Sequence, residues 1–181
     1  FDIEEKGGSV PTLPDPESKR WTITDLAASA IGYSVKQTPL SIVTFYNAIA
    51  NDGKMMKPYI IDSYEKNGKV TKKFKPQILN GTICSAATAD TVTRALVVVT
   101  KEGTAAKLKD ARCVVAGKTG TAQVSKGAGG YRGGNMQYLV SFCGYFPSEE
   151  PKYSCIVAIQ KSGLPASGGL MAGSVFSEIA E

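Results

Sequence analysis

Hydrophobic and polar residues recur along this chain with two periods, and these periods predict its helices and strands. Apolar residues at helical spacing predict helices over residues 38–51, over about 86–101, and in a closing segment that follows Gly169. Thr38 and Ser85 are the expected N-caps of the first two, because their side-chain oxygens accept hydrogen bonds from free backbone N–H groups.

Strand patterns fill other parts of the chain. Residues 59–65 and 70–74 flank Asn67-Gly68, the strongest sequence signal for a two-residue hairpin turn. Three further strands are predicted late in the chain, and the last two are nearly continuous apolar runs, typical of central or doubly covered strands. These three cover residues 112–124, 137–146 and 153–160, with a glycine-rich turn at 127–134 after the first. The order predicts an α+β fold, an antiparallel sheet flanked by helices.

The pattern divides residues 1–181 into three stretches of one partial domain. Residues 1–37 are rich in Gly, Pro and charge and are predicted to form an extended loop or arm. Residues 38–110 hold helices and a hairpin, and residues 111–181 hold the sheet strands and the closing helix. The first residue is Phe1 rather than Met, which indicates a processing point or an artificial boundary, with any targeting or anchoring signal upstream.

Composition is ordinary for a globular domain, with 43% hydrophobic and 20% charged residues among 181. The net charge is +5, and the one dense basic run carries neither aromatic stacking residues nor a recognition helix, so we expect no nucleic-acid partner. We interpret this run as a solvated hairpin edge, since lysines commonly protect edge strands. It consists of Lys66, Lys69, Lys72, Lys73 and Lys75.

Cysteine and histidine usage limits the chemistry. The four cysteines form no C-x-x-C pair and there is no histidine, so we expect no zinc site. Cys143 and Cys155 lie in apolar runs and are predicted to be buried, with at most one disulfide in the chain. A Ser-His-Asp or Cys-His mechanism cannot be completed within this chain, so acyl transfer would need lysine to handle protons.

The informative string is Lys118-Thr119-Gly120-Thr121. One alternative is a surface strand with a turn glycine. Another is a phosphate loop, because residues 117–119 match the end of G-x-x-x-x-G-K-[ST]. Against that alternative, Arg112 stands where the first glycine belongs, and Gly120 follows where a helix should begin.

The string extends to Ala-Gly-Lys-Thr-Gly-Thr-Ala-Gln over residues 116–123, which resembles the class B penicillin-binding proteins. Further stretches resemble this family too, at residues 31–33, 38–40, 46–51, 141–147 and 168–179. The resemblance is nearest to the division-type transpeptidases that make septal peptidoglycan. It implies part of a penicillin-binding transpeptidase fold, which is also the fold of serine β-lactamases, and no cofactor.

The resemblance also implies roles for the string. Lys118 would be a catalytic residue that pairs with the ligand carboxylate, bonds the serine of an S-x-N motif and relays protons. Thr119 and Thr121 would donate hydrogen bonds to the carboxylate, and Gly120 would let the substrate lie along the strand. The backbone N–H of Thr121 would form half of an oxyanion hole. The implied ligands are stem peptides ending in D-Ala-D-Ala and β-lactams, with division proteins as partners.

The nucleophile of this family, the serine of S-x-x-K, is not expected within the chain. Ser63 and Lys66 fit the string, but they lie on a predicted hairpin strand, where positions three apart point to opposite faces. No S-x-N motif occurs, so both motifs are expected upstream of Phe1, together with a membrane anchor on the extracytoplasmic (periplasmic) face. The fragment alone is therefore predicted to be inactive and to expose apolar area on the sheet and on helix 38–51.

A β-lactam sensor or another non-catalytic module of the same fold is the alternative. An intact S-x-x-K and S-x-N upstream would favour the enzyme.

Overall fold

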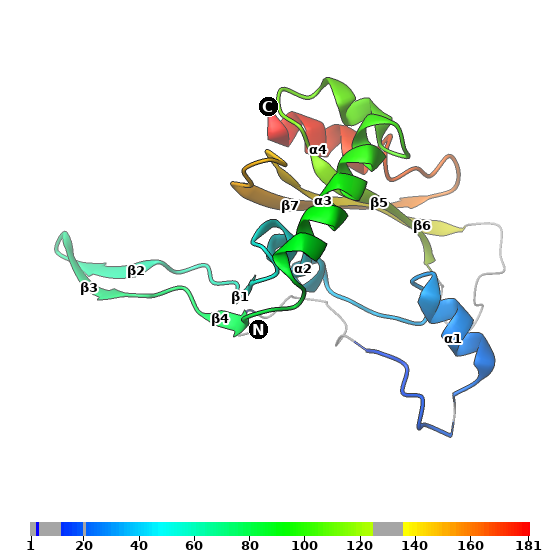
Figure 1. Ribbon diagram of the computed structural model, residues 1–181, viewed down its shortest axis with the longest axis horizontal. Helices are drawn as coiled ribbons and strands as arrows, with labels where there is room; N and C mark the ends of the chain where they lie inside the picture. Colours follow the sequence, from blue (N-terminus) through cyan, green and yellow to red (C-terminus); the bar gives the residue numbers. More distant parts are fainter. Residues whose placement is uncertain (1–2, 4–11, 20, 125–135) are drawn as a thin grey trace.

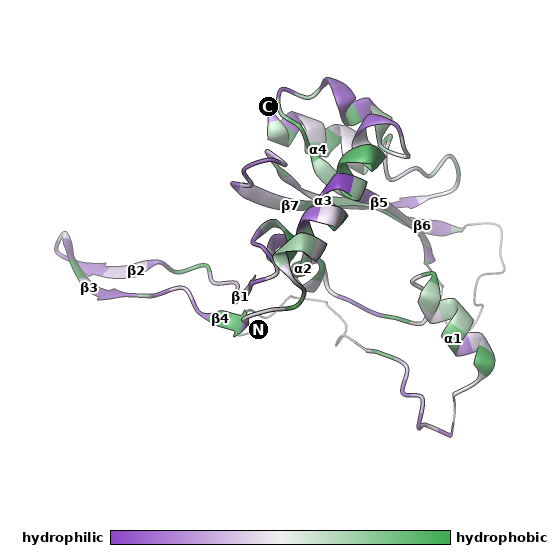
Figure 2. Cartoon of the chain, viewed as in Figure 1, coloured by the Kyte–Doolittle hydropathy of each residue, from purple (hydrophilic) through white to green (hydrophobic). Residues whose placement is uncertain are grey.

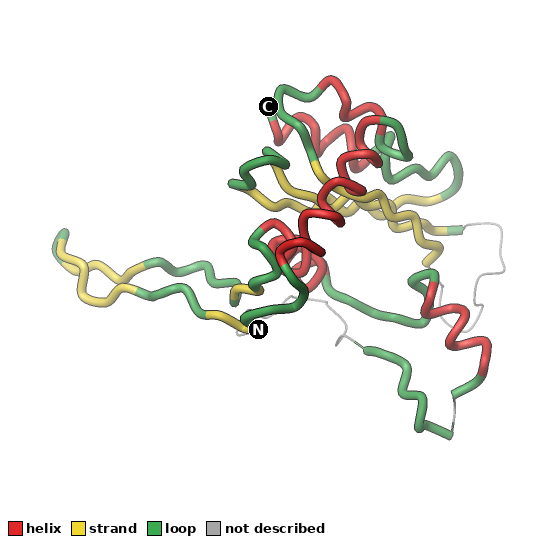
Figure 3. Tube along the Cα trace, in the orientation of Figure 1, coloured by secondary structure: helices red, strands yellow, loops and turns green. Residues whose placement is uncertain are grey.

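The computed structural model describes residue 3 and residues 12–19, 21–124 and 136–181 (Figure 1). At its centre lies a three-stranded antiparallel sheet in the order β5-β6-β7. Its strands are β5 (Ala116–Val124), β6 (Gln137–Phe146) and β7 (Tyr153–Ser162). Figure 3 shows helices on both sides of these strands. The predicted α+β class and the antiparallel pairing are confirmed.

The first strand begins four residues later than predicted. Residues 114 and 115 precede β5, and their carbonyl groups bond to partners outside the sheet. The Val114 carbonyl accepts from the N–H of Ser148, at 2.8 Å, and the Val115 carbonyl accepts from the hydroxyl of Thr100, at 2.7 Å. Ladder pairing with β6 starts at Ala116, opposite Tyr145.

The closing helix α4 (Ala172–Ala180) packs on one face of the sheet, as predicted. The aromatic rings of Phe142 and Phe176 meet edge to face, with centroids 4.7 Å apart, and both side chains are fully buried. Leu108, in the short 3₁₀ helix η1 (Ala106–Asp110), belongs to the same cluster. This cluster anchors the loop between residues 101 and 110 beside the sheet.

The opposite face carries α2 (Pro39–Ala50) and the first part of α3 (Ala86–Lys101). Both predicted N-caps are present: the Thr38 hydroxyl accepts from the N–H of Ser41, and the Ser85 hydroxyl from that of Thr88. Tyr145 is buried beneath these helices, and its hydroxyl hydrogen-bonds that of Thr93, at 2.6 Å. Two separate hydrophobic clusters therefore cover the two faces of the sheet.

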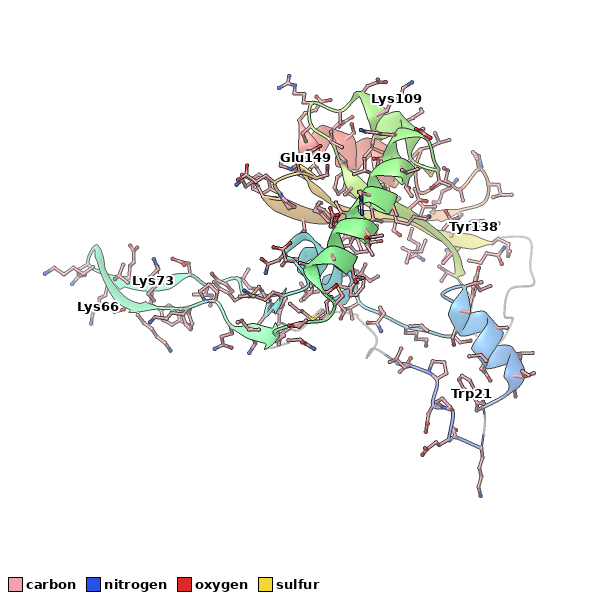
Figure 4. All side chains as sticks on the ribbon, in the orientation of Figure 1. Trp21, Lys66, Lys73, Lys109, Tyr138 and Glu149 are labelled. Atoms are coloured by element: carbon pink, nitrogen blue, oxygen red, sulfur yellow. The ribbon has the colours of Figure 1, made fainter. Side chains whose placement is uncertain are left out.

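The predicted hairpin is formed by β2 (Ser63–Lys66) and β3 (Lys69–Lys73), and it projects away from the sheet (Figure 1). Asn67 and Gly68 both have positive φ, 52° and 71°, as a primed two-residue turn requires. The side chains of Lys66 and Lys73 point out from this hairpin in Figure 4, and its strands are mostly hydrophilic in Figure 2. The hairpin starts at residue 63 rather than 59. A second two-stranded pair, β1 (Met55–Met56) with β4 (Ile78–Asn80), was not predicted.

The prediction that residues 1–37 form only a loop or arm is wrong at one place, because α1 (Ile23–Ala30) is a helix. A capping box starts it: the Asp25 carboxylate accepts from the N–H of Thr22, at 2.8 Å. Ile23 and Leu26 are 84% and 61% exposed. The helix is therefore stabilised by local capping rather than by an apolar face packed on the core. For this reason the hydrophobic periodicity of the sequence did not predict it.

The cysteine predictions are confirmed in part. Cys143 is buried and all four cysteines are free, within the limit of one disulfide. Cys155 is only half-buried, because it lies on β7, the outer strand of the sheet. Burial raises the pKa of the Cys143 thiol to about 12.

Two further observations concern the predicted surface features. Apolar exposure on the sheet and on α2 is present at Leu139 and Phe45. The predicted turn at 127–134 lies outside the described residues. In the described part of the chain, no helix has the length and hydropathy needed to span a membrane.

Candidate active-site strand

Strand β5 carries all four residues of the string, at the edge of the sheet. Its inner side pairs with β6 along its whole length, and no described strand pairs with its outer side. The outer N–H and C=O groups of an edge strand are available to a polypeptide that adds as a further strand. The geometry of β5 is therefore that of a strand-addition site.

Alternation along β5 divides the four residues between the two faces of the sheet. Lys118 and Gly120 lie opposite Cys143 and Ser141, on the face that carries α2. Thr119 and Thr121 lie on the other face, towards the loop 101–110 and the segment before α4.

The ammonium group of Lys118 is turned along its own strand. Its Nζ donates to the carbonyl oxygen of Thr119, at 3.1 Å, and to the hydroxyl Oγ1 of the same residue, at 3.2 Å. The side chain is exposed. Lys118 and the Thr119 hydroxyl thus form one polar group at the sheet edge, with a positive charge and a hydroxyl that an anion can approach together.

Both threonine hydroxyls are held from outside the strand. Thr104, in the loop after α3, places its Oγ1 2.9 Å from the Oγ1 of Thr119. Gly168 donates its N–H to the Oγ1 of Thr121, at 3.3 Å. Sequence reasoning assigned no role to Thr104 or Gly168. No local sequence pattern distinguishes Thr104 from other loop residues. The pair Gly168-Gly169 indicates only the start of the closing segment.

Close packing explains two of the glycines, against the Ser141 side chain at Gly120 and against backbone at Gly168. A Cβ on Gly120 would lie 2.5 Å from the Ser141 hydroxyl oxygen. A Cβ on Gly168 would lie 2.6 Å from the carbonyl oxygens of both Gly120 and Ser141. Real Cβ atoms do not make such contacts, so the main chain before α4 rests directly on the backbone of the site strand.

The structure contradicts the phosphate-loop alternative. Gly117 and Lys118 lie within β5, so no helix begins after them. A phosphate loop needs a helix N-terminus at this point. Among the residues that the structure describes, no group of three or more His, Cys, Asp or Glu side chains is placed to hold a metal ion.

Ser63 and Lys66 are not part of this site. They lie on β2, in the projecting hairpin, and β2 packs mainly against β3. Lys66 sits beside the hairpin turn, opposite Lys69, and is exposed. Neither residue can act as nucleophile or base at β5.

Almost the whole chain matches the model of one known protein family. The profile described as "Penicillin binding protein transpeptidase domain" matches residues 3–181. Stage V sporulation protein D of Bacillus subtilis is 34% identical over 158 residues, which cover 84% of this chain and 24% of that protein. A protein named peptidoglycan D,D-transpeptidase FtsI homolog, from Mesostigma viride, is 27% identical over 168 residues, covering 86% of this chain and 28% of that protein.

Solved structures agree with the fold. A structure of penicillin-binding protein A from M. tuberculosis, described as a ceftriaxone acyl-enzyme complex, superposes with a TM-score of 0.76 at 22% identity. The superposition covers 95% of this chain and 38% of that one. The chain spans about a quarter of the length of the sporulation protein and of the FtsI homolog.

Proposed function

The chain belongs to the penicillin-binding protein transpeptidase domain family, and on this premise we propose that it is the C-terminal part of a serine D,D-transpeptidase. The parent enzyme would cross-link peptidoglycan stem peptides through an acyl-enzyme, and β-lactams would acylate the same serine. The observation that carries the proposal is the string 118–121 on an exposed edge strand, with a lysine and a hydroxyl presented together.

The substrate suits this edge strand. A stem peptide ending in D-Ala-D-Ala is extended, and its carboxylate lies next to the scissile carbonyl. Main-chain groups of β5 pair with the peptide, while Lys118, Thr119 and Thr121 bind the carboxylate through charge-assisted hydrogen bonds. Gly120 itself adds no side chain at the centre of this contact, where the Ser141 hydroxyl lies close to the strand.

The reacting carbonyl lies over the end of the same string. The backbone N–H of Thr121 donates to the developing oxyanion, and its partner donor is supplied by the nucleophile segment. In other enzymes, loss of one such donor raises the barrier by ~2.7–4 kcal/mol. Lys118 also hydrogen-bonds the serine of the S-x-N motif and takes part in proton transfer.

The nucleophile belongs to a part of the protein outside residues 1–181. A serine hydroxyl needs an adjacent base to attack a carbonyl, and the only Ser-x-x-Lys string of this chain lies in the projecting hairpin. We therefore propose that this chain has no transpeptidase activity by itself.

The cellular setting follows from the substrate. Peptidoglycan is assembled outside the cytoplasmic membrane, so the domain works on the extracytoplasmic face, held there by an anchor elsewhere in the protein. The likeness to division-type enzymes supports a role in septal synthesis with division proteins as partners.

The test uses the full-length protein and a fluorescent penicillin. We expect a covalent, denaturation-resistant label whose appearance is slowed by a thioester substrate analogue of the stem peptide. Peptide mapping should place the label on a serine upstream of Phe1. A full-length protein that takes no label, or takes it on a residue of this chain, would contradict the proposal.

A further inference from the structure

Thr104 holds the hydroxyl of Thr119 from a loop that is itself firmly held. Gly103 lies two residues after α3, and a Cβ added to it would lie 2.9 Å from the Cα of Val99. Ala105 follows, 1% exposed, with its N–H donated to the Val99 carbonyl, at 3.2 Å. Both neighbours fix the backbone of Thr104, although its side chain is exposed.

A second contact holds the same residue from the opposite side. Gly169 packs so tightly on the Thr104 carbonyl that an added Cβ would overlap that oxygen, at 2.1 Å. The loop after α3, the glycine pair before α4 and strand β5 therefore meet at one point, and the side chain of Thr104 reaches the strand from it, 2.9 Å from the Thr119 hydroxyl.

Donor counting distinguishes the two directions that the hydrogen bond between Thr104 and Thr119 can take. A hydroxyl has one proton and two acceptor lone pairs. Lys118 Nζ, which can only donate, occupies one lone pair of Thr119 Oγ1. If Thr104 donates to the other, the Thr119 proton is left for a third partner. If Thr104 accepts instead, the Thr119 hydroxyl proton is bonded to Thr104 and cannot be donated to a ligand.

A ligand carboxylate accepts hydrogen bonds and donates none. It can bond to Thr119 only in the first arrangement. We propose that Thr104 is a positioning residue for carboxylate recognition: by donating to Thr119, it turns the Thr119 proton towards the ligand. This inference rests on the proposed function, since it concerns the anion that the strand 118–121 binds.

The experiment compares two ligands in the full-length protein, benzylpenicillin and its methyl ester. Thr104→Val keeps the shape of the side chain and removes the hydroxyl. We expect it to weaken the pre-covalent affinity for benzylpenicillin roughly two- to tenfold, the range for one net hydrogen bond. The acylation rate constant at saturation should change little. The methyl ester lacks the carboxylate charge, so its pre-covalent affinity should fall much less than that of benzylpenicillin. Thr104→Ser retains the donor and should restore wild-type affinity.

Controls separate positioning from simple support. Thr71→Val removes a hydroxyl whose bond, to the Tyr64 carbonyl at 3.0 Å, lies within the projecting hairpin, and it should leave both ligands unaffected. On a Thr119→Val background, Thr104→Val should have no further effect on the acid-to-ester ratio. If Thr104→Val melts far below wild type, Thr104→Ala takes its place, with the same selective loss expected.

Two results would overturn the inference: an equal loss for acid and ester, or no loss for either. Both leave the proposed function standing, provided that the wild-type protein is acylated. A wild-type protein that benzylpenicillin does not acylate contradicts the proposed function itself.

Discussion

Gly168 packs directly on the backbone of Gly120, 48 positions earlier in the chain, and gives its N–H to the neighbouring Thr121 hydroxyl. The strand proposed to bind the ligand therefore rests on a second glycine segment without any intervening side chain. The spacing between the two segments is set by backbone contact, so small changes at position 168 should displace the strand.

Gly168→Ala should displace strand β5. Its Cβ would approach two carbonyl oxygens at 2.6 Å, and backbone cannot move away as a flexible side chain does. We expect a loss of stability of ~1–3 kcal/mol, as for other overpacked sites, together with slower acylation. Urea unfolding and penicillin labelling measure the two effects. Gly81→Ala is the matched control, because an added Cβ there meets nothing within 4 Å.

Phe176→Ala should test the packing of α4 on the sheet. The Phe176 ring is fully buried against Phe142 and Phe146, so its removal leaves a cavity in the larger core cluster. Truncation of a buried aromatic costs ~3–5 kcal/mol, measurable as a lower urea midpoint. Leu170→Ala, at an exposed position before α4, should change stability by less than ~0.5 kcal/mol. Equal effects of both changes would show that the α4 contact contributes little.

Lys118→Ala in the full-length protein should slow acylation by a fluorescent penicillin by roughly two to four orders of magnitude. On the proposed function, the change removes charged hydrogen bonds to the ligand carboxylate and to the S-x-N serine, each worth ~1.5–3 kcal/mol. Lys152→Ala, which breaks only an exposed ion pair with Glu150, is the control and should label normally. Normal labelling of the Lys118 variant would remove Lys118 from the site.

Residues 1–181 alone should form no covalent adduct with benzylpenicillin. In the described part, the Nζ of Lys118 on the strand proposed to bind the carboxylate donates to Thr119, and the Ser-x-x-Lys string of residues 63–66 lies in the projecting hairpin. Intact-mass spectrometry after incubation with excess ligand should show the unmodified mass only. A stoichiometric increase mapped to any serine of this chain would overturn the assignment of the nucleophile to another part of the protein.

Stability should fall at alkaline pH. Burial, together with the nearby Cys143 and Tyr145, raises the pKa of Tyr46 from 10.0 to about 12, and burial raises that of Cys143 from 9.0 to about 12. The folded state thus holds these protons more tightly than the unfolded state. Their stabilisation is complete below about pH 9 and is lost as the pH rises towards 12.

The free energy of unfolding in urea, compared at pH 8 and pH 11, measures this loss. Tyr46→Phe has no proton to lose at this position, so its free energy should fall less steeply over the same range. A variant that falls as steeply as the wild type would show that Tyr46 does not contribute.

The elements with local signals were predictable from the sequence. Thr38 and Ser85 marked helix starts because a capping oxygen lies three residues from the N–H that it satisfies. Asn67-Gly68 marked the hairpin because few residues adopt positive φ easily. The capping box at Thr22 and Asp25 was a signal of the same local kind, but the Gly, Pro and charge around it obscured it.

The candidate strand was predictable as far as its own residues go. The string 118–121 and its place on a strand followed from the sequence, and the structure shows that strand at the sheet edge, paired along one side with β6. The contacts that other segments make with this strand were not predictable. Thr104 lies 15 residues from the hydroxyl that it contacts, in a loop whose course depends on Gly103, Ala105 and Gly169.

The sequence by itself determined the helices and strands that carry local signals, and it marked the four-residue string to which we assign the recognition chemistry. These are properties of neighbouring residues, set by dihedral preference, capping and alternation. Only the tertiary structure decided that Gly168 lies against Gly120 and that Thr104 reaches Thr119. Those contacts arise when separate segments return to the same place on the sheet, and their distances depend on register and core packing along the whole path between them.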